Sequence, residues 1–222
     1  MKNSDNLHKK PWSTKKAMDQ IYKNNLWGRG KSNFFSGDGS HDSAILNPYL
    51  KALSLFLTSF NKPLTIVDLG CGDFNVGNQL LHLSENYIGV DIVETLIQRN
   101  KDVFKDHNLK FYCLDIALDK LPEGDIALLR QVLQHLSNKE IYKIIRKLPS
   151  YKYVVLTEHI PEGNFDANID LVSGQGTRLK KNSGVDLFQP PFNLKVKNST
   201  SLLTLEVKKW KGIIVTTLLE MY

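Results

Sequence analysis

The sequence predicts an α/β protein built around an open, mostly parallel β-sheet. Apolar runs typical of strands alternate with helix-like segments between residues 64 and 157, as in sheets assembled from β-α-β units. The first strand ends at Asp68, just before a glycine turn at residues 70–72. The second strand ends at Asp91, close to the spacing of about 20 residues expected for a carboxylate that binds a ribose. Together these features predict a nucleoside-binding cleft at the carboxyl ends of the strands.

The region before the first strand is expected to contain two helices joined by a loop. Residues 14–26 place apolar side chains at helical spacing among lysines. Residues 27–40 form a glycine-rich loop with three large aromatic side chains, typical of a mobile segment that closes over a ligand. An ordinary linker held by the packing of Trp27 is the alternative. The second helix is expected to begin at Pro48, with Asn47 as its N-cap.

Seven strands are expected, with helices on both faces of the sheet. The last two, at residues 202–207 and 212–219, are β-rich runs separated by residues 208–211. Between residues 160 and 200 the alternation stops, and such a long irregular stretch in a compact domain is usually functional or mobile. The first five strands are expected at residues 66–69, 87–90, 110–114, 125–130 and 153–157.

Composition and charge limit the class of protein. The 222 residues suffice for one well-buried domain, and no apolar run approaches the ~20 residues needed to span a bilayer. The N-terminus lacks the apolar core of a signal peptide. Two cysteines suggest reduced thiols in a cytoplasmic protein, and no Cys/His spacing suited to a metal is present.

The net charge of +6 comes entirely from residues 1–31, which hold eight Lys or Arg and two Asp. Such an arm suits phosphate groups, although a solvated terminus is the more common explanation. We therefore expect a basic arm and lid over residues 1–40, followed by one domain over residues 41–222.

The glycine spacing helps to identify the expected cofactor. A dinucleotide site uses G-x-G-x-x-G, whereas the position of the third glycine is occupied here by Asn75. Asp73 would also place a negative charge where a pyrophosphate would lie. A cofactor with a cationic end suits this turn better. The D-L-G-C-G segment resembles motif I of class I S-adenosylmethionine (SAM)-dependent methyltransferases, and residues 89–91 resemble their motif II.

This resemblance implies a Rossmann-like fold with a terminal hairpin that forms an antiparallel C-terminal edge strand. It also implies SAM as cofactor and a role for each matching position. Asp68 would help to hold the methionine end, the two glycines would line the cofactor, and Asp91 would bind the ribose hydroxyls. The fourth strand and the turn after it would complete the site. The cofactor-binding residues implied in this way are Asp68, Gly70, Cys71, Gly72, Asn75, Asp91, Ile92, Asp115, Ile116, Arg130 and Gln131.

The acceptor half is similar to a subset of small bacterial methyltransferases. The shared features are a W-G leader, an R-x-V-L-x-H-L-S segment after the fourth strand, and an L-x-x-P-P-F segment within an insert over residues 160–200. His135, His159 and Glu158 are the candidate catalytic residues. Imidazole titrates near neutral pH, so either histidine could be the general base, with Glu158 orienting it or sharing that task. For His135, packing at a helix start is equally plausible. The candidate substrate-binding residues are Trp27, Asp170, Arg178 and Phe192. Arg178 is the best anion-binding candidate, with a surface salt bridge as its alternative role.

The sequence thus predicts transfer of a methyl group from SAM to a hydroxyl of a small-molecule or glycan-type acceptor. An RNA or nucleotide methyltransferase that uses the basic arm is an alternative, though nucleic acid is the less favoured partner. A SAM-binding protein without turnover is another. The acceptor, the choice among the candidate bases and the oligomeric state stay open at this level.

Overall fold

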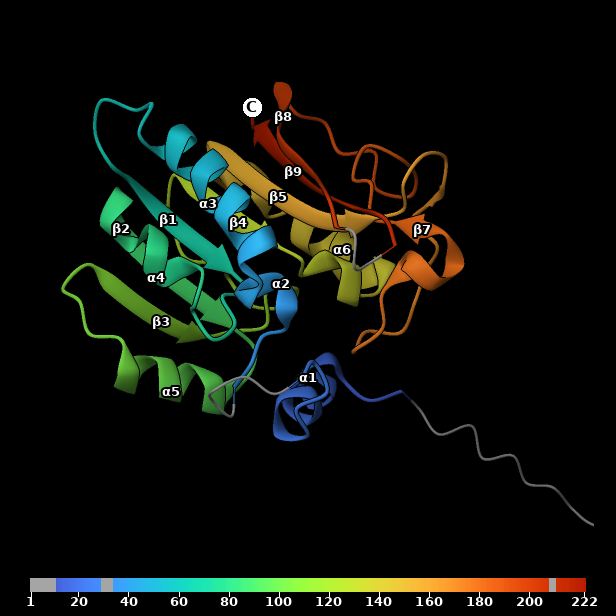
Figure 1. Cartoon of the computed structure of the whole chain (residues 1–222), viewed down its shortest axis with the longest axis horizontal. Coiled ribbons are helices and arrows are strands. Elements are labelled where there is room, and N and C mark those ends of the chain that lie inside the picture. Colours follow the sequence, from blue (N-terminus) through green and yellow to red (C-terminus); the bar gives the residue numbers. More distant parts are fainter. Residues whose placement is uncertain (1–10, 29–33, 208–210) are drawn as a thin grey trace, which may run out of the picture.

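A computed structural model describes residues 11–28, 34–207 and 211–222. Its centre is a seven-stranded sheet with the order β3-β2-β1-β4-β5-β9-β8 (Figure 1). The five strands β1 to β5 are parallel, and β9 runs antiparallel to both of its neighbours. The strands are β1 (Leu64–Leu69), β2 (Ser84–Asp91), β3 (Leu109–Cys113), β4 (Ile126–Arg130), β5 (Tyr153–Ile160), β8 (Asn198–Glu206) and β9 (Ile213–Glu220).

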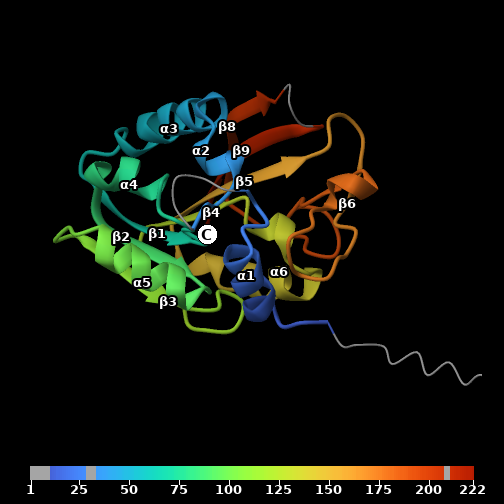
Figure 2. The same cartoon turned by 60° about the horizontal axis from the view of Figure 1, so that its bottom comes forward.

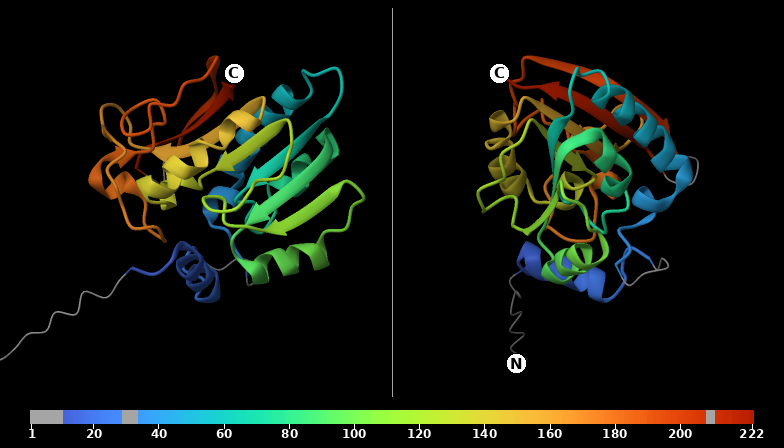
Figure 3. Two further views of the ribbon diagram at one scale, coloured as in Figure 1. Left: turned by 180° about the vertical axis from the view of Figure 1, so that it is seen from behind. Right: turned by 90° about the vertical axis from the view of Figure 1, so that its left-hand side faces the viewer.

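Helices cover both faces of the sheet, as predicted. Seen from behind, α6 lies in front of the sheet and α3 on its far side (Figure 3). Two apolar clusters result, because successive residues of a strand point to opposite faces: Ile66 packs in the cluster with Leu53 of α3, and Val67 in the cluster with Ile141 of α6. The helices are α1 (Thr14–Lys23), α2 (Asp38–His41), α3 (Ser43–Leu57), α4 (Gly77–Leu80), α5 (Glu94–Val103) and α6 (Asn138–Ile145).

Two helix boundaries differ from those predicted. The second long helix, α3, begins at Ser43 and not at Pro48, because the side chain of Asp42 accepts a hydrogen bond from the Ala44 N–H at 2.9 Å and caps the helix earlier. Pro48 lies inside α3, whose buried face holds the helix together despite the missing donor. The first helix, α1, ends at Lys23, and Asn25 adopts a left-handed backbone conformation with φ 51° that stops it.

The predicted terminal hairpin is present at the edge of the sheet. Its last strand, β9, is antiparallel and pairs with β5, which leaves β8 as the outermost strand. The region from residue 161 to residue 197 contains only the short pair β6 (Asp166–Ala167) and β7 (Ser183–Gly184) and one 3-10 turn, Arg178–Lys181. We call this region the insert. None of the helices within the described residues is long and apolar enough to cross a membrane.

Some sequence predictions concern residues outside the described ranges. The basic arm and the centre of the glycine-rich loop include residues 1–10 and 29–33, and the link between the last two strands includes residues 208–210. The division into an arm and lid over residues 1–40 and a domain over residues 41–222 therefore stays a prediction.

Strand β5 carries a buried carboxyl group towards its C-terminal end. Glu158 is 3% exposed. Its Oε1 accepts a hydrogen bond from the Leu133 N–H at 3.2 Å, and its Oε2 has no hydrogen-bond partner among the described residues. Burial raises the pKa of Glu158 to about 8. The side chain is therefore mainly uncharged at neutral pH.

Glu158 should make the stability of the protein depend on pH. The folded state holds this proton more tightly than the unfolded chain does. The resulting stabilisation is complete below pH 4.5, the ordinary pKa of the group in the unfolded chain, and it is lost as the pH rises through about 8. In urea unfolding between pH 5 and 9, Glu158→Gln should abolish a fall in unfolding free energy on the order of a few kcal/mol. The exposed Glu123→Gln should leave that fall unchanged, and equal slopes for Glu158→Gln and the wild type would contradict this assignment.

Candidate functional site

A cavity of about 420 Å³ lies at the carboxyl ends of the parallel strands. Its floor is formed by the ends of β1, β2, β4 and β5, and its cover includes Tyr22 of α1 and Ser36 in the following loop. Figure 2 shows α1 in front of the strand ends, when the molecule is tilted to bring them forward. Most of the predicted site residues line this cavity: Trp27, Gly70, Cys71, Gly72, Asp91, Ile92, Asp115, Ile116, Arg130, Gln131, His135 and His159.

The glycine turn after β1 brings backbone to the cavity wall. Gly70 and Gly72 have φ values of 90° and 56°, which side-chain-bearing residues rarely adopt. A Cβ at Gly70 would lie 2.4 Å from Val132, and one at Gly72 would lie 2.5 Å from the Ser36 hydroxyl. The turn therefore requires glycine for both its conformation and its packing. Cys71, between them, is 8% exposed, and burial raises the pKa of its thiol.

Asp91, at the end of β2, is the carboxylate best placed to bind hydroxyl groups. Its Oδ2 accepts from the Gly72 N–H at 3.1 Å and its Oδ1 from the Val93 N–H at 3.0 Å. A carboxylate has about four acceptor positions, so these bonds fix its orientation and leave capacity for a diol such as a ribose. Further along the wall, Oδ1 of Asp115 accepts from the Ala117 N–H at 2.8 Å.

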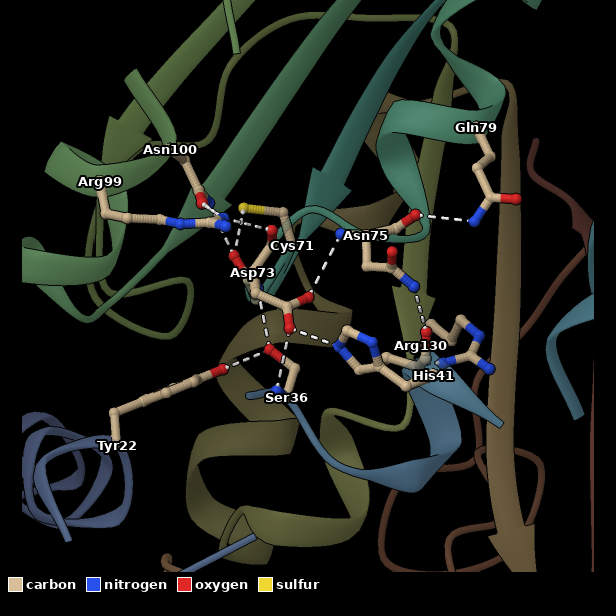
Figure 4. Close-up of polar contacts among 12 residues, drawn as sticks. Tyr22, Ser36, His41, Cys71, Asp73, Asn75, Gln79, Arg99, Asn100 and Arg130 are labelled. Atoms are coloured by element: carbon tan, nitrogen blue, oxygen red, sulfur yellow. Dashed lines mark hydrogen bonds and ion pairs between the residues drawn. The ribbon is translucent and has the colours of Figure 1, made fainter. Parts of the chain in front are cut away.

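Asp73, next in the chain to the glycine turn, joins this turn to the loop before α2. Its Oδ2 accepts from the Ser36 N–H at 3.1 Å and lies 2.6 Å from Nε2 of His41, while Oδ1 accepts from the Asn75 N–H at 3.2 Å (Figure 4). The Ser36 hydroxyl in turn accepts from the Asp73 N–H at 2.8 Å and lies 2.9 Å from the Tyr22 hydroxyl. The N-terminal cover is thus hydrogen-bonded directly to the turn that would hold the cofactor.

Helix α5 supports the same turn from the opposite side. Asn100, which is fully buried, donates from Nδ2 to the Gly72 carbonyl at 2.7 Å. Arg99 donates from Nη1 to the Asp73 carbonyl and to Oδ1 of Asn100, both at 2.9 Å (Figure 4). The Gly72 and Asp73 carbonyls are therefore held by α5. The backbone N–H groups of residues 70–73 are bonded to the Val90 carbonyl, to Asp91 and to Ser36, so the turn has a fixed conformation.

Arg130 ends β4 and places a cation beside the cavity. It donates from Nη2 to the Gly39 carbonyl at 2.5 Å and from Nη1 to the Ser40 hydroxyl at 3.4 Å, and it lies 4.7 Å from the centre of the Tyr49 ring. Its Nε is buried and has no hydrogen-bond partner among the described residues. An anionic group of a ligand would supply such a partner. Gln131, the next residue, has φ 55° and packs against Gly39.

Two of the predicted cofactor residues do not line the cavity. Asp68 is buried behind the turn, where its Oδ2 accepts from the Tyr87 hydroxyl at 2.9 Å and burial raises its pKa to about 6. Asn75 donates from Nδ2 to the Ser40 carbonyl at 2.6 Å. Both residues stabilise segments that line the cavity through these hydrogen bonds. That Asp68 helps to hold the methionine end of the cofactor stays a prediction.

Trp27 and the two histidines lie in the part of the cavity that faces the insert. The rings of Trp27 and His135 are 5.2 Å apart, and Nε1 of Trp27 is buried without a hydrogen-bond partner among the described residues. His135 Nδ1 lies 3.3 Å from the Gly176 carbonyl of the insert. His159, at the end of β5, lies with Nε2 2.9 Å from the Lys211 carbonyl. Glu158, the third catalytic candidate, lies outside the cavity lining.

The remaining substrate-binding candidates have structural contacts. Arg178 is 2% exposed and lies outside the cavity lining. Its guanidinium has five N–H groups, and its five hydrogen bonds run to the side chain of Asn138 and to four backbone carbonyls, those of residues 133, 134, 136 and 169. The expectation that Arg178 binds an anion is therefore replaced by a structural role: it ties the insert to the turn after β4. Asp170 accepts from the Asn138 N–H at 2.8 Å, and Phe192 packs in the core.

The sequence analysis did not single out several residues that line the cavity. Met18 and Tyr22 reach it from α1, Gln134 from the turn after β4, and Glu140 from the first turn of α6. Glu140 forms a capping box with Ser137, and the S-x-x-E spacing of that box was a usable signal in the sequence. Met18 and Tyr22 are four positions apart, as expected for one face of a helix, but the sequence did not show that this face covers a cavity.

Comparison with known proteins agrees with the fold. The methyltransferase domain family matches residues 67–148, which contain the glycine turn and Asp91. No curated protein sequence matches the chain.

Solved structures with the same fold have low sequence identity to this chain. An N-methyltransferase from Bradyrhizobium japonicum WM9 with bound S-adenosyl-L-homocysteine (SAH) has a TM-score of 0.66 at 10% identity, covering 92% of this chain and 98% of that one. Magnesium protoporphyrin IX methyltransferase from Synechocystis PCC 6803 with bound SAM has a TM-score of 0.57 at 15% identity. The match covers 96% of this chain and 99% of that one.

Human N-acetylserotonin methyltransferase in complex with SAM has a TM-score of 0.51 at 14% identity and matches 90% of this chain. The present chain spans 62% of the length of that human enzyme. The strand order with an antiparallel β9, the glycine turn with Asp91 at the strand ends and the family match converge on one conclusion: the chain carries a class I SAM-dependent methyltransferase domain.

Proposed function

We propose that the domain transfers the methyl group of SAM to a hydroxyl oxygen of a small-molecule acceptor. The observation that carries this proposal is a single cavity with Asp91 in one part of its wall and His159 in another. Asp91 suits the binding of a nucleoside, and His159 suits the transfer of a proton. Two structural relatives are named for small molecules, N-acetylserotonin and magnesium protoporphyrin IX. Another is an N-methyltransferase, so the choice of oxygen rests on the histidine and not on the fold.

The residues present fit SAM. Asp91 has free acceptor positions for the ribose hydroxyls, the glycine turn leaves space for close approach, and the unpartnered Nε of Arg130 can pair with the carboxylate of the methionine end. Asp115 and Ile116 would border the base. When bound, SAM supplies an electrophilic methyl group on a positively charged sulfur. The protein's part is then to position the acceptor, which can contribute roughly 7–11 kcal/mol, and to remove its proton.

His159 is the residue that we assign to proton removal. The Lys211 carbonyl only accepts hydrogen bonds, so the contact at 2.9 Å places a proton on Nε2 of His159 and makes Nδ1 the basic nitrogen. Burial lowers the pKa of His159, so the ring is mainly neutral at pH 7, the form that a general base requires. Its place at the end of β5, which is paired along its whole length with β9, keeps it in a rigid position.

Replacing Asp91 should weaken cofactor binding. Asp91→Asn should raise the SAH dissociation constant by roughly 10- to 100-fold, because hydrogen bonds to a charged acceptor are worth about 1.5–3 kcal/mol. Calorimetric titration of the wild type, Asp91→Asn and the exposed control Asp102→Asn would measure this, with melting temperatures to confirm folding. If NAD bound in place of SAH, the methyltransferase assignment would be wrong.

Replacing His159 should slow turnover and spare binding. His159→Gln should reduce kcat by about 10²–10⁴-fold, with SAH affinity within twofold of the wild type, and the exposed His107→Gln should change neither. Because the His159 pKa lies below the ordinary value near 6.5, wild-type activity should persist below pH 6.5 and fall only as the pH drops further.

The measurement is transfer of labelled methyl from SAM to hydroxyl compounds. Turnover that survives in His159→Gln with an unchanged pH profile would exclude His159 as the base. SAH binding without transfer to any hydroxyl, amine or RNA acceptor would instead indicate a SAM-binding protein without turnover. Salt-sensitive transfer to RNA would favour the alternative that uses the basic arm.

A further inference from the structure

We propose that Gln134 is a positioning residue that holds His135 as a neutral imidazole with its proton on Nδ1, so that His135 takes no part in proton transfer. The residue belongs to the cavity wall and lies in the 3-10 turn Leu133–His135. Its relevance to catalysis rests on the proposed function, but the protonation state itself can be measured independently of turnover.

The orientation of the Gln134 amide is set by strand β5. Gln134 is 7% exposed, and its Oε1 lies 3.3 Å from the backbone N of His159. A backbone N–H only donates, so the atom that faces it is the oxygen of the amide and not the nitrogen. The Nε2 amino group of Gln134 must then point the other way, towards His135.

The tautomer of His135 follows from this orientation. Nε2 of Gln134 lies 3.2 Å from Nε2 of His135. The amino group only donates, so the ring nitrogen accepts and carries no proton. On the other side of the ring, Nδ1 lies 3.3 Å from the Gly176 carbonyl, which only accepts. The two contacts, made by separate parts of the chain, require the same neutral form with the proton on Nδ1.

The surroundings of His135 disfavour its protonation. Burial is the main cause that lowers the pKa of His135, to about 4, and the positive charge of Arg178 of the insert also opposes an imidazolium. Glu158 and His159 of β5 contact the preceding residues, Leu133 and Gln134, and both are mainly neutral at pH 7. Glu140 of α6 lines the same cavity, but its carboxylate bonds to Ser137 and Ser173. Burial and Arg178 therefore both oppose a charged ring.

This arrangement separates the roles of the two histidines. The lone pair of His135 is occupied by Gln134 and its N–H by the insert, so its ring serves as a fixed wall that packs against Trp27. The backbone N–H of His159 holds the amide of Gln134, and the ring of His159 lines the same cavity. The hydrogen-bonded series from β5 through Gln134 and His135 to Gly176 also fixes the distance between the strand end and the insert.

The test is the tautomer of His135 in the full-length protein, read from long-range ¹H–¹⁵N NMR of labelled histidines and assigned with His135→Gln. Wild-type His135 should show a protonated Nδ1 and an unprotonated Nε2 from pH 6 to 8. An ionised Glu in place of Gln134 can only accept at this position. Gln134→Glu should therefore move the His135 proton to Nε2 and raise the pKa of the ring towards or above 6.5; the exposed Gln98→Glu should change nothing.

Three results would overturn the proposal: a wild-type ring protonated on Nε2, a wild-type ring that gains a second proton between pH 6 and 8, or an unchanged His135 signal in a folded Gln134→Glu. If that variant does not fold, the wild-type tautomer decides the question alone. Calorimetric titration with SAH, run on the same samples, keeps the proposed function separate. A wild type that fails to bind SAH would remove that function while leaving the tautomer result standing.

Discussion

The buried carboxylate of Asp73 is the contact on which the site depends most. It accepts hydrogen bonds from two backbone N–H groups, one before α2 and one beyond the glycine turn, and it pairs with His41. A buried carboxylate without such partners would be strongly destabilising. With them, it holds the N-terminal segment against the sheet, and α1 can form the cover of the cavity. The glycine turn is thus both a ligand cradle and the docking point for its own cover.

The electrostatics of the site follow from which buried groups have partners. Burial raises the pKa of Asp91, and the two backbone N–H groups that bond to its oxygens oppose that rise. Glu158 has one such bond and one unpartnered oxygen, and it is mainly uncharged at neutral pH. Both histidines of the cavity have pKa values lowered by burial. The cavity therefore offers charge where a cofactor would bind and neutral groups where an acceptor would react, which suits the loss of a proton from a hydroxyl.

Arg178 illustrates what buried cations do in a fold of this kind. A guanidinium in an irregular insert has the chemistry of an anion site, and nothing local in the sequence distinguishes that use from any other. In the structure its donors meet carbonyls of the turn after β4, at residues 133, 134 and 136. The insert, poor in regular structure, is attached by these bonds and by His135 and Gly176. Part of what the motif comparison implied as substrate binding is therefore the fixing of the insert.

The sequence alone determined the parallel sheet, the glycine turn and the acids at the ends of β1 and β2, because strand periodicity, glycine conformation and helix spacing are local properties. It also placed Arg130, His135 and His159 correctly at strand ends or directly after them. Only the tertiary structure decided which of these side chains face the cavity, that α1 covers it, and which atom of each histidine carries the proton. Those properties arise from contacts between segments far apart in the chain, such as Gln134 with His159 or Ser36 with Asp73. Burial and hydrogen-bond partners of this kind have no signature in local sequence.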